Sequence, residues 1–299
     1  MGGQLVNLDS ALARVSAEID GELDRLLRVP GDARARLYEA MRYSAIGAGK
    51  RLRPLLVVAA CDLFKVARQR SLRVALAAEC IHVYSLIHDD LPSMDNDDLR
   101  RGKPTLHRAF DESTAILAGD SLHALAFEVL ADEATHEDPF VRAELVLELA
   151  RAAGPAGMAG GQMMDLSAEG MILDLAAVTR LQQLKTGALI GWTLEASAIM
   201  GRVLPEGRTS LRGYARDIGL AFQIADDLLD HEGSEEKAGK RVGKDSSAGK
   251  ETFVSLLGPE RARRQAQVLV DQAVEHLRAF GEEADMLRAL ARFMVERDH

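Results

Sequence analysis

The sequence predicts an all-α protein, on three grounds. Apolar residues recur at intervals of three and four positions through most of the chain, the period of one helical face, whereas alternating strand patterns are scarce. Ala, Leu, Arg and Glu dominate long stretches. Aromatic residues make up only 4% of the 299 residues, and the 8 prolines are fewer than the average of roughly 5%. We expect about ten or more helices.

In chain order, the helical period runs through residues 8–27, 37–46, 72–87, 115–130, 141–150, 173–200, 211–229, 262–280 and 286–295. Proline and glycine separate these segments, at 30–31, 138–139, 154–155, 205–207 and 258–259. The polar stretch 232–250 is too weakly periodic for a helix, so we expect a mobile surface loop. Neither a long linker nor a short-period repeat interrupts the pattern, which favours a single domain over residues 1–299.

Composition excludes several classes of protein. A formal net charge of −9 argues against nucleic-acid binding, which needs a basic surface. Cys61 and Cys80 form no CxxC pair and suit a reducing cytoplasm. Acidic residues precede any apolar run at the N-terminus, which excludes signal and transit peptides. The apolar run 55–61 is far shorter than the ~20 residues that cross a bilayer. We expect a soluble, cytoplasmic protein without a membrane partner.

The strongest local signal is a cluster of aspartates where an apolar helix is expected to end: Asp89, Asp90, Asp95, Asp97 and Asp98. These carboxylates repel one another unless a cation or water relieves them. A solvated acidic turn is the alternative, but Leu86 and Ile87 bring a core helix directly to Asp89. An EF-hand is excluded because Arg100 stands where its calcium loop requires glycine. A divalent-metal site is therefore the better interpretation.

A second cluster contains Asp226, Asp227 and Asp230 within an otherwise apolar helical segment. Asp226 and Asp230 lie one turn apart on one helical face, and Gln223 precedes them on that stripe. An exposed acidic edge is the alternative, but the apolar neighbours favour a cavity wall. Hard carboxylate oxygens favour Mg²⁺, which binds few carboxylates together with water and phosphate oxygens.

Basic residues that could bind phosphate are present, although each alone resembles an ordinary surface residue: Lys50, Arg51, Arg53, Arg100, Arg101, Lys185, Lys240 and Lys250. Neither a Walker A loop nor GxGxxG occurs, and GxSxG and HExxH are absent. His82 and His88 lie on the helical segment that leads to the first cluster, and for each the alternative to a site residue is a packed helix residue. The pattern indicates metal-assisted phosphate chemistry without a protein nucleophile.

These motifs resemble those of the trans-isoprenyl diphosphate synthases, most closely of the bacterial farnesyl diphosphate synthase type. DDLPSMD resembles the family's first aspartate-rich motif and DDLLD its second, and GKRLRP, LIHDD, RRG, GQMMD, KTG and FQIADDLLD follow in the family's order. The resemblance implies mostly antiparallel helices around a deep central cavity, with the two aspartate motifs facing each other. It also implies a homodimer and three Mg²⁺ ions.

The resemblance implies condensation of isopentenyl diphosphate with an allylic diphosphate. It assigns Mg²⁺ binding to Asp89, Asp90, Asp95, Asp226, Asp227 and Asp230. Arg100, Lys185 and Lys240 would contact the allylic diphosphate, and Thr186 and Gln223 would line its site. Lys50, Arg53, His82 and Arg101 would bind isopentenyl diphosphate, and Lys250 is a further candidate substrate ligand.

Product length is expected to depend on Tyr84, with Ser85 beside it. Tyr84 lies five residues before Asp89, about 7.5 Å along a helix, where a bulky aromatic residue favours farnesyl diphosphate in this family. A geranyl or geranylgeranyl diphosphate synthase shares every motif and is the main alternative. A terpene cyclase, an inactive partner subunit and a metal-binding scaffold are less consistent with two intact aspartate motifs.

Overall fold

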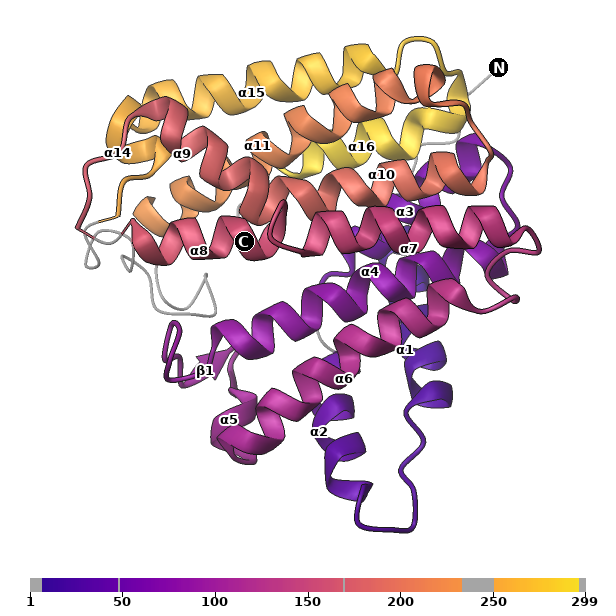
Figure 1. Cartoon of the computed structure of the whole chain (residues 1–299). Helices are drawn as coiled ribbons and strands as arrows, with labels where there is room; N and C mark the ends of the chain where they lie inside the picture. The colour runs from indigo at the N-terminus through magenta and orange to yellow at the C-terminus, as the bar shows by residue number, and fades with distance from the viewer. Residues whose placement is uncertain (1–6, 48, 169, 233–249, 296–299) are drawn as a thin grey trace. The chain divides into compact units, whose positions relative to one another are not determined.

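The computed structural model describes residues 7–47, 49–168, 170–232 and 250–295. These residues form α-helices with short 3-10 and π segments, and the only strands among them are two residues long, so the all-α prediction is confirmed (Figure 1). The residues group into two compact units, each described by itself below. The prediction of one domain over residues 1–299 stays a prediction.

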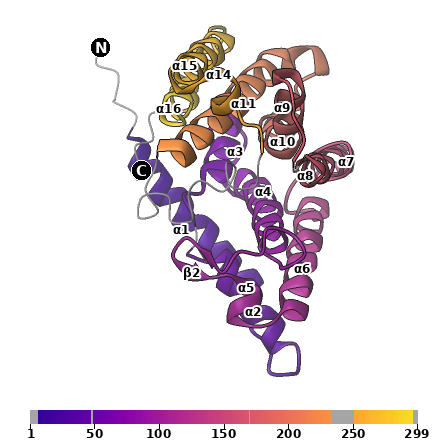
Figure 2. The ribbon, with the colours of Figure 1, turned by 90° about the vertical axis from the view of Figure 1, so that its left-hand side faces the viewer.

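The first unit comprises Asp9–Val58 and Val66–Val146. It contains nearly all of α1 (Leu8–Leu26), α2 (Ala35–Ala45), the start of α3 (Leu52–Leu63), α4 (Arg68–Asp89), α5 (Leu106–Ala109), α6 (Glu112–Ala131) and the start of α7 (Pro139–Ala153). Buried residues recur on α1 at Ala11, Val15, Ile19 and Leu23. α4 lies along α6 and buries every residue from Val74 to Ile81, so its middle is covered on all sides (Figure 2).

A small hairpin follows α4 in this unit. β1 (Leu99–Arg100) pairs antiparallel with β2 (Lys103–Pro104), and Arg100 lies opposite Lys103. Arg101 and Gly102 form the two-residue turn with φ angles of 53° and 73°. Positive φ at both turn positions is the geometry that twisted hairpins prefer. These strands were not predicted, because two residues cannot show an alternating pattern.

The second unit comprises Met1–Leu8, Ala59–Lys65 and Leu147–His299. It contains α8 (Met158–Ser167), α9 (Leu175–Gln182), the π-helix η1 (Gln183–Gly187), α10 (Ala188–Met200), the 3-10 helix η2 (Pro205–Arg208), α11 (Thr209–Glu232), α14 (Phe253–Leu257), α15 (Pro259–His276), the 3-10 helix η3 (Glu282–Ala284) and α16 (Asp285–Phe293). α11 packs against α10 and α15, while α8 packs against η1. The buried Tyr214 hydroxyl donates a hydrogen bond to the Leu287 carbonyl at 2.7 Å and so ties α11 to α16.

The helical segments predicted by periodicity are present within a few residues of their expected bounds. The segment 173–200 is divided by η1, and α3, α5, α8 and α14 were not predicted. α8 was missed because Gly160 and Gly161 interrupt its apolar pattern. Residues 233–249 of the expected loop lie outside the described residues.

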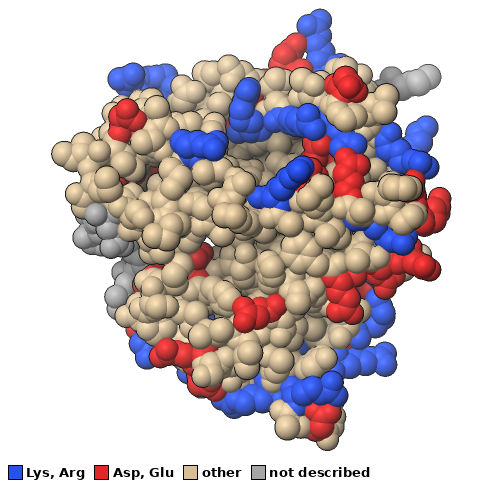
Figure 3. Space-filling view, in the orientation of Figure 1, with Lys and Arg blue, Asp and Glu red and all other residues tan. Residues whose placement is uncertain are grey.

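The surface charge and the membrane-spanning potential of the helices can be compared with the expectations from composition. Basic and acidic side chains are interspersed on the face drawn in Figure 3. Within the described ranges, α6 is long and apolar enough to cross a membrane by length and composition alone, which the expectation based on 55–61 overlooked. α6 packs against α2, α4 and α5 and buries Ala115, Leu122 and Leu130, as a core helix of a globular unit does.

Candidate active site

The first aspartate cluster lies where α4 ends and the chain folds back on that end. The Asp95 amide donates a hydrogen bond to the Asp89 carbonyl at 2.8 Å, and the Asp97 amide donates one to the Asp90 carbonyl at 3.2 Å. These bonds satisfy carbonyls that a helix end leaves without partners. They also bring the backbone of Asp95 back to that of Asp89.

Asp90 and Arg100 form the tightest charge pair at this helix end. The Arg100 guanidinium donates to both Asp90 carboxylate oxygens, at 2.6 to 2.9 Å. Burial raises the pKa of Asp90, Arg100 opposes that rise, and Asp97 and Asp95 add to it. A predicted metal ligand and a predicted phosphate ligand are thus paired with each other in this structure.

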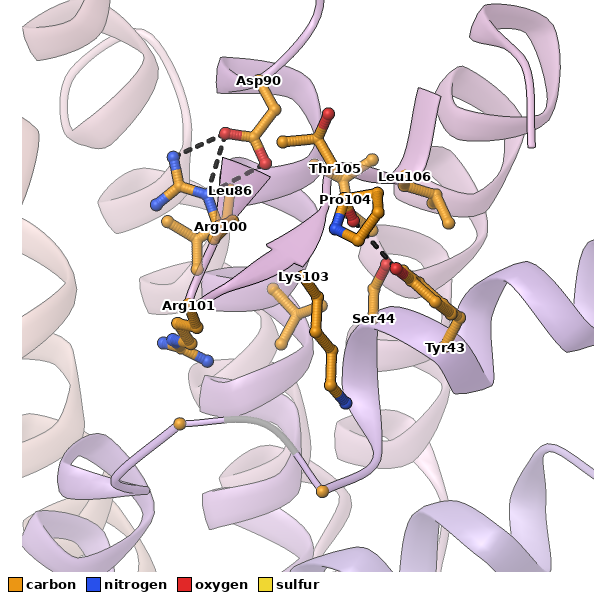
Figure 4. A pocket seen from close by; sticks show the side chains of 14 residues that line it. Tyr43, Ser44, Leu86, Asp90, Arg100, Arg101, Lys103, Pro104, Thr105 and Leu106 are labelled. Atoms are coloured by element: carbon orange, nitrogen blue, oxygen red, sulfur yellow. Dashed lines mark hydrogen bonds and ion pairs between the residues drawn. The ribbon is translucent and has the colours of Figure 1, made fainter. Parts of the chain in front are cut away.

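A cavity of about 140 Å³ lies beneath the hairpin, between α2 and α4. Its wall includes Asp90, Arg100, Arg101 and Lys103, with apolar side chains from α4 and α5 and the hydroxyl-bearing residues Tyr43 and Ser44 (Figure 4). The Tyr43 hydroxyl donates a hydrogen bond to the Pro104 carbonyl at 2.9 Å and so anchors the hairpin to α2. The three cations outnumber the single carboxylate, so the cavity favours an anion.

Two of the predicted isopentenyl diphosphate ligands, Arg53 and Arg101, lie near a third, His82. Burial lowers the pKa of His82 well below 6.5, and Arg53, Arg101, Arg100 and Arg51 lower it further, in that order. A neutral histidine among arginines indicates strong positive potential. Arg51 itself is buried between Asp20 and Glu79, at 2.5 and 2.6 Å, which explains why an arginine is tolerated there. Lys50 is exposed and Arg53 is half-buried.

Aromatic rings pack between α4 and α6. The Tyr84 ring lies edge-on to His123 with centroids 4.8 Å apart and to His88 at 5.8 Å, and His123 in turn meets Phe127 at 5.1 Å. His88 reaches the Ile116 carbonyl at 3.1 Å because Gly119 leaves room for its ring. Sequence reasoning missed His123, whose only signal was its place on an apolar helix. The Ser85 hydroxyl donates a hydrogen bond to the His82 carbonyl, one turn earlier.

In the second unit, η1 presents Lys185 and Thr186. A π-helix is uncommon and is often found at functional sites. Lys185 Nζ lies 2.8 Å and Lys250 Nζ 2.9 Å from the same Asp165 oxygen. Burial raises the pKa of Asp165, but the two lysines outweigh this and hold it below its usual value. Asp165 belongs to the motif GQMMD, and the sequence alone did not indicate a role for it.

The second aspartate cluster lies on α11 with Gln223. The Thr186 hydroxyl donates to the Gln223 amide oxygen at 3.2 Å, and the Gln223 amide nitrogen donates to Asp227 at 3.0 Å. The other Asp227 oxygen accepts the Phe253 amide at 2.9 Å. Asp227 is buried, and both of its carboxylate oxygens accept hydrogen bonds, so in this arrangement it orients Gln223. Its role as a metal ligand stays a prediction. Asp226 and Asp230 are half-buried on the same helix.

The chemistry of these carboxylates fits Mg²⁺. No group of three or more His, Cys, Asp or Glu side chains in the described ranges is close enough to hold an ion by itself. Mg²⁺ usually takes one or two carboxylates and completes its shell with water and phosphate oxygens, so a substrate-dependent site is consistent with that finding. The two clusters belong to different units, so the prediction that they face one another stays a prediction. Lys240 lies outside the described residues.

Comparison with known proteins identifies the family. Residues 34–292 match the polyprenyl synthetase family model. The chain is 46% identical to the farnesyl diphosphate synthase of Escherichia coli (strain K12) over 87% of this chain and 89% of that relative. It is 44% identical to the geranylgeranyl pyrophosphate synthase 4 of Arabidopsis thaliana over 88% of this chain and 71% of the relative.

Solved structures agree with this result. A farnesyl/geranylfarnesyl (FPP/GFPP) synthase from Zymomonas mobilis has a TM-score of 0.91 and 60% identity and covers 98% of this chain and 100% of its own. A geranyltransferase from Helicobacter pylori, complexed with magnesium and isoprenyl diphosphate, has a TM-score of 0.86 and 32% identity and covers 99% of this chain and 100% of its own. The chain belongs to the polyprenyl synthetase family and is a prenyltransferase that elongates prenyl chains.

Proposed function

We propose that this prenyltransferase is a farnesyl diphosphate synthase. It condenses isopentenyl diphosphate with dimethylallyl diphosphate and then with geranyl diphosphate, and releases diphosphate each time. The observation that carries the choice of product is the edge-to-face packing of Tyr84 on His123, which places two rings side by side between α4 and α6. Relatives from three bacteria that carry this name, at 43 to 46% identity, support the proposal.

The anion-binding residues divide between the two substrates. Arg100, Lys185 and Lys240 bind the allylic diphosphate, while Lys50, Arg53, His82 and Arg101 bind isopentenyl diphosphate. Mg²⁺, of which the resemblance implies three ions, would be held by Asp89, Asp90, Asp95, Asp226 and Asp230 with Asp227 in support. When bound, it neutralises diphosphate charge and makes diphosphate a better leaving group.

The protein's own groups then act on charge. Arg100 and Lys185 stabilise the negative charge that develops as the allylic C–O bond breaks. The Lys185 carbonyl and the Thr186 hydroxyl present the negative ends of their dipoles to the allylic cation, and apolar walls exclude water from it. The C=C of isopentenyl diphosphate forms the new C–C bond, and the proton lost from that unit goes to the departed diphosphate. This route needs no protein base.

Asp165 is a positioning residue in this scheme. Its single carboxylate oxygen holds Lys185 and Lys250 together, so both ammonium groups are directed to one place before substrate arrives. Gln223 is held in the same way by Thr186 and Asp227. Preorganised charge of this kind lowers the reorganisation needed at the transition state.

A turnover assay tests the function. The purified chain is incubated with Mg²⁺, isopentenyl diphosphate and each allylic diphosphate in turn, and the products are separated by chain length. We expect a fifteen-carbon product, and loss of turnover with EDTA. Asp89→Ala and Asp226→Ala are each expected to lower kcat by orders of magnitude while the fold persists, because the loss falls on transition-state charge. Near-normal rates in both variants would refute the assigned roles.

A longer product is the second candidate. The name of the Zymomonas structure includes a geranylfarnesyl product, and several relatives are called geranylgeranyl synthases. The same assay separates these outcomes, because twenty- or twenty-five-carbon products would replace the farnesyl compound.

We also propose that the enzyme works as a homodimer in the cytoplasm. α6 exposes Ile116 and Leu117 beside its buried residues. One relative, from Arabidopsis thaliana, carries a name that describes it as the large subunit of a heterodimeric synthase. A second copy of this chain is the occupant that we propose for this apolar surface.

A further inference from the structure

The hairpin carries a third cation, Lys103, to which neither the sequence motifs nor the family resemblance gave a role. Lys103 is exposed and lines the cavity together with Arg100 and Arg101. Figure 4 shows its side chain extending from the hairpin on the side away from Asp90. An exposed lysine is most simply a solvated surface charge, but the hairpin gives Lys103 a defined position.

The register of the hairpin determines where Lys103 lies relative to the other two cations. Arg100 and Lys103 lie directly opposite each other on the two strands, so both side chains emerge on the same face of the ribbon. Arg101 is fixed between them by the two-residue turn, although its φ of 53° is unfavourable for an arginine. The fold accepts this backbone strain and places three cations within four residues at one cavity.

The three cations differ in how far protein carboxylates neutralise them. Arg100 is paired with Asp90 at 2.6 Å. Neither Arg101 nor Lys103 has a carboxylate within ion-pair distance among the described residues. Two neighbouring cations without such a partner repel each other unless an anion lies between them.

The contact that Arg101 makes indicates which substrate would supply the anion between Arg101 and Lys103. A Cβ built on Gly49 would lie 2.4 Å from an Arg101 guanidinium nitrogen, so Arg101 packs directly on the loop that leads to Lys50. Gly49 also lines the cavity that contains Lys103. Lys50 and Arg101 are the residues proposed for isopentenyl diphosphate, whereas Arg100 is assigned to the allylic substrate.

We propose that Lys103 binds the diphosphate of isopentenyl diphosphate, as a third cation beside Lys50 and Arg101. This inference rests on the proposed function. The lysine acts as a movable point charge at the mouth of the cavity, and it contributes to capture of this substrate and not to the bond-breaking step. Removing it therefore changes KM for one substrate and leaves kcat nearly unchanged.

The test compares Lys103→Gln and Lys103→Arg with the intact enzyme, varying each substrate separately. We expect Lys103→Gln to raise KM for isopentenyl diphosphate about tenfold, with kcat and the allylic KM within about twofold, and Lys103→Arg to restore most of the affinity. Arg108→Gln is the matched control, because Arg108 follows on the same segment, is exposed and pairs with Asp98. An unchanged KM in Lys103→Gln, or an equal rise in the allylic KM, would overturn the proposal.

A binding measurement separates this proposal from the proposed function. Calorimetric titration of the full chain with inorganic diphosphate in EDTA reports the anion site without turnover. Lys103→Gln should weaken this binding several-fold and reduce its dependence on salt, whereas Arg108→Gln should not. If the enzyme shows no turnover but the variant loses diphosphate affinity, the proposed function fails and the anion site stands. Equal affinity in variant and parent refutes the role of Lys103.

Discussion

Tyr84 is the single residue on which the product assignment depends most. Its ring packs edge-on against His123 and His88, so its removal opens space between α4 and α6. We expect Tyr84→Ala to lengthen the main product by at least one isoprene unit, measured by chromatography of the dephosphorylated products. Tyr38→Ala, the same truncation on α2, should leave the product unchanged. An unaltered chain length in Tyr84→Ala would remove Tyr84 as the limiting residue.

Asp165 offers a second test at this scale. Replacing it with asparagine removes the carboxylate that holds Lys185 and Lys250, so both lysines lose their common anchor. We expect Asp165→Asn to lower kcat/KM for the allylic substrate by about 10- to 100-fold, since a partly buried charge pair contributes more than a surface pair. Glu22→Gln breaks an exposed pair with Arg25 and should have no effect. Equal activity of the two variants would contradict the positioning role.

The lowered pKa of Asp165 also predicts how stability depends on pH. A carboxyl group whose folded pKa lies below its unfolded value stabilises the folded state above the unfolded pKa. This contribution is lost as pH falls through the folded pKa. The difference in unfolding free energy between the parent and Asp165→Asn should therefore be largest near neutral pH and shrink below about pH 4, in urea titrations at several pH values. A difference that stays constant to pH 3 would contradict it.

Single residues differ in how far the sequence revealed them. Asp89, Asp90 and Asp95 were recognisable because five carboxylates in a short stretch are unusual. The role of Asp165 was not, because its two partners lie 20 and 85 residues away in the chain. Contacts of that kind depend on packing between helices, which periodicity does not specify.

At the scale of elements, the close contact between α8 and η1 positions Lys185. A Cβ added to Gly161 would lie 2.2 Å from the Lys185 amide nitrogen, so only glycine allows this approach. We expect Gly161→Ala to cost roughly 1–3 kcal/mol of unfolding free energy and to lower kcat, because the backbone of η1 has to shift. Calorimetry and steady-state kinetics measure the two effects.

Gly191→Ala on α10 is the matched control for that variant. Nothing lies within 4 Å of a Cβ at Gly191, so alanine should leave activity unchanged and stabilise the helix by up to about 1 kcal/mol. If Gly161→Ala were as stable and as active as Gly191→Ala, the tight contact would have no functional importance.

The elements themselves were only partly predictable. The long helices show their period clearly, so α1, α4, α6, α11 and α15 were expected. The hairpin was not, since its turn requires Arg101 to adopt a positive φ that no propensity favours. The π-helix was equally hidden, because η1 differs from an α-helix by one inserted residue and keeps its polarity pattern.

At the scale of the whole molecule, composition specified the fold class but not the assembly. The helical content followed from periodicity and low proline, whereas packing within each unit depends on side-chain shapes. A chain with a net charge of −9 gains no electrostatic help in associating with its own copy, so a dimer needs an apolar interface. Ile116 and Leu117 on α6 are 44% and 56% exposed and supply such a surface.

Leu117→Glu tests whether this surface joins two copies. Light scattering after size exclusion should give the parent twice the 32.5 kDa mass of one chain. Leu117→Glu should shift the protein toward the single-chain mass, because burying an unpaired carboxylate at the centre of an apolar interface costs several kcal/mol in each copy. Leu204→Glu makes the same change at a leucine that is 72% exposed elsewhere, and it should stay dimeric. A monomeric parent would refute the homodimer, and a dimeric Leu117→Glu would place the interface away from α6.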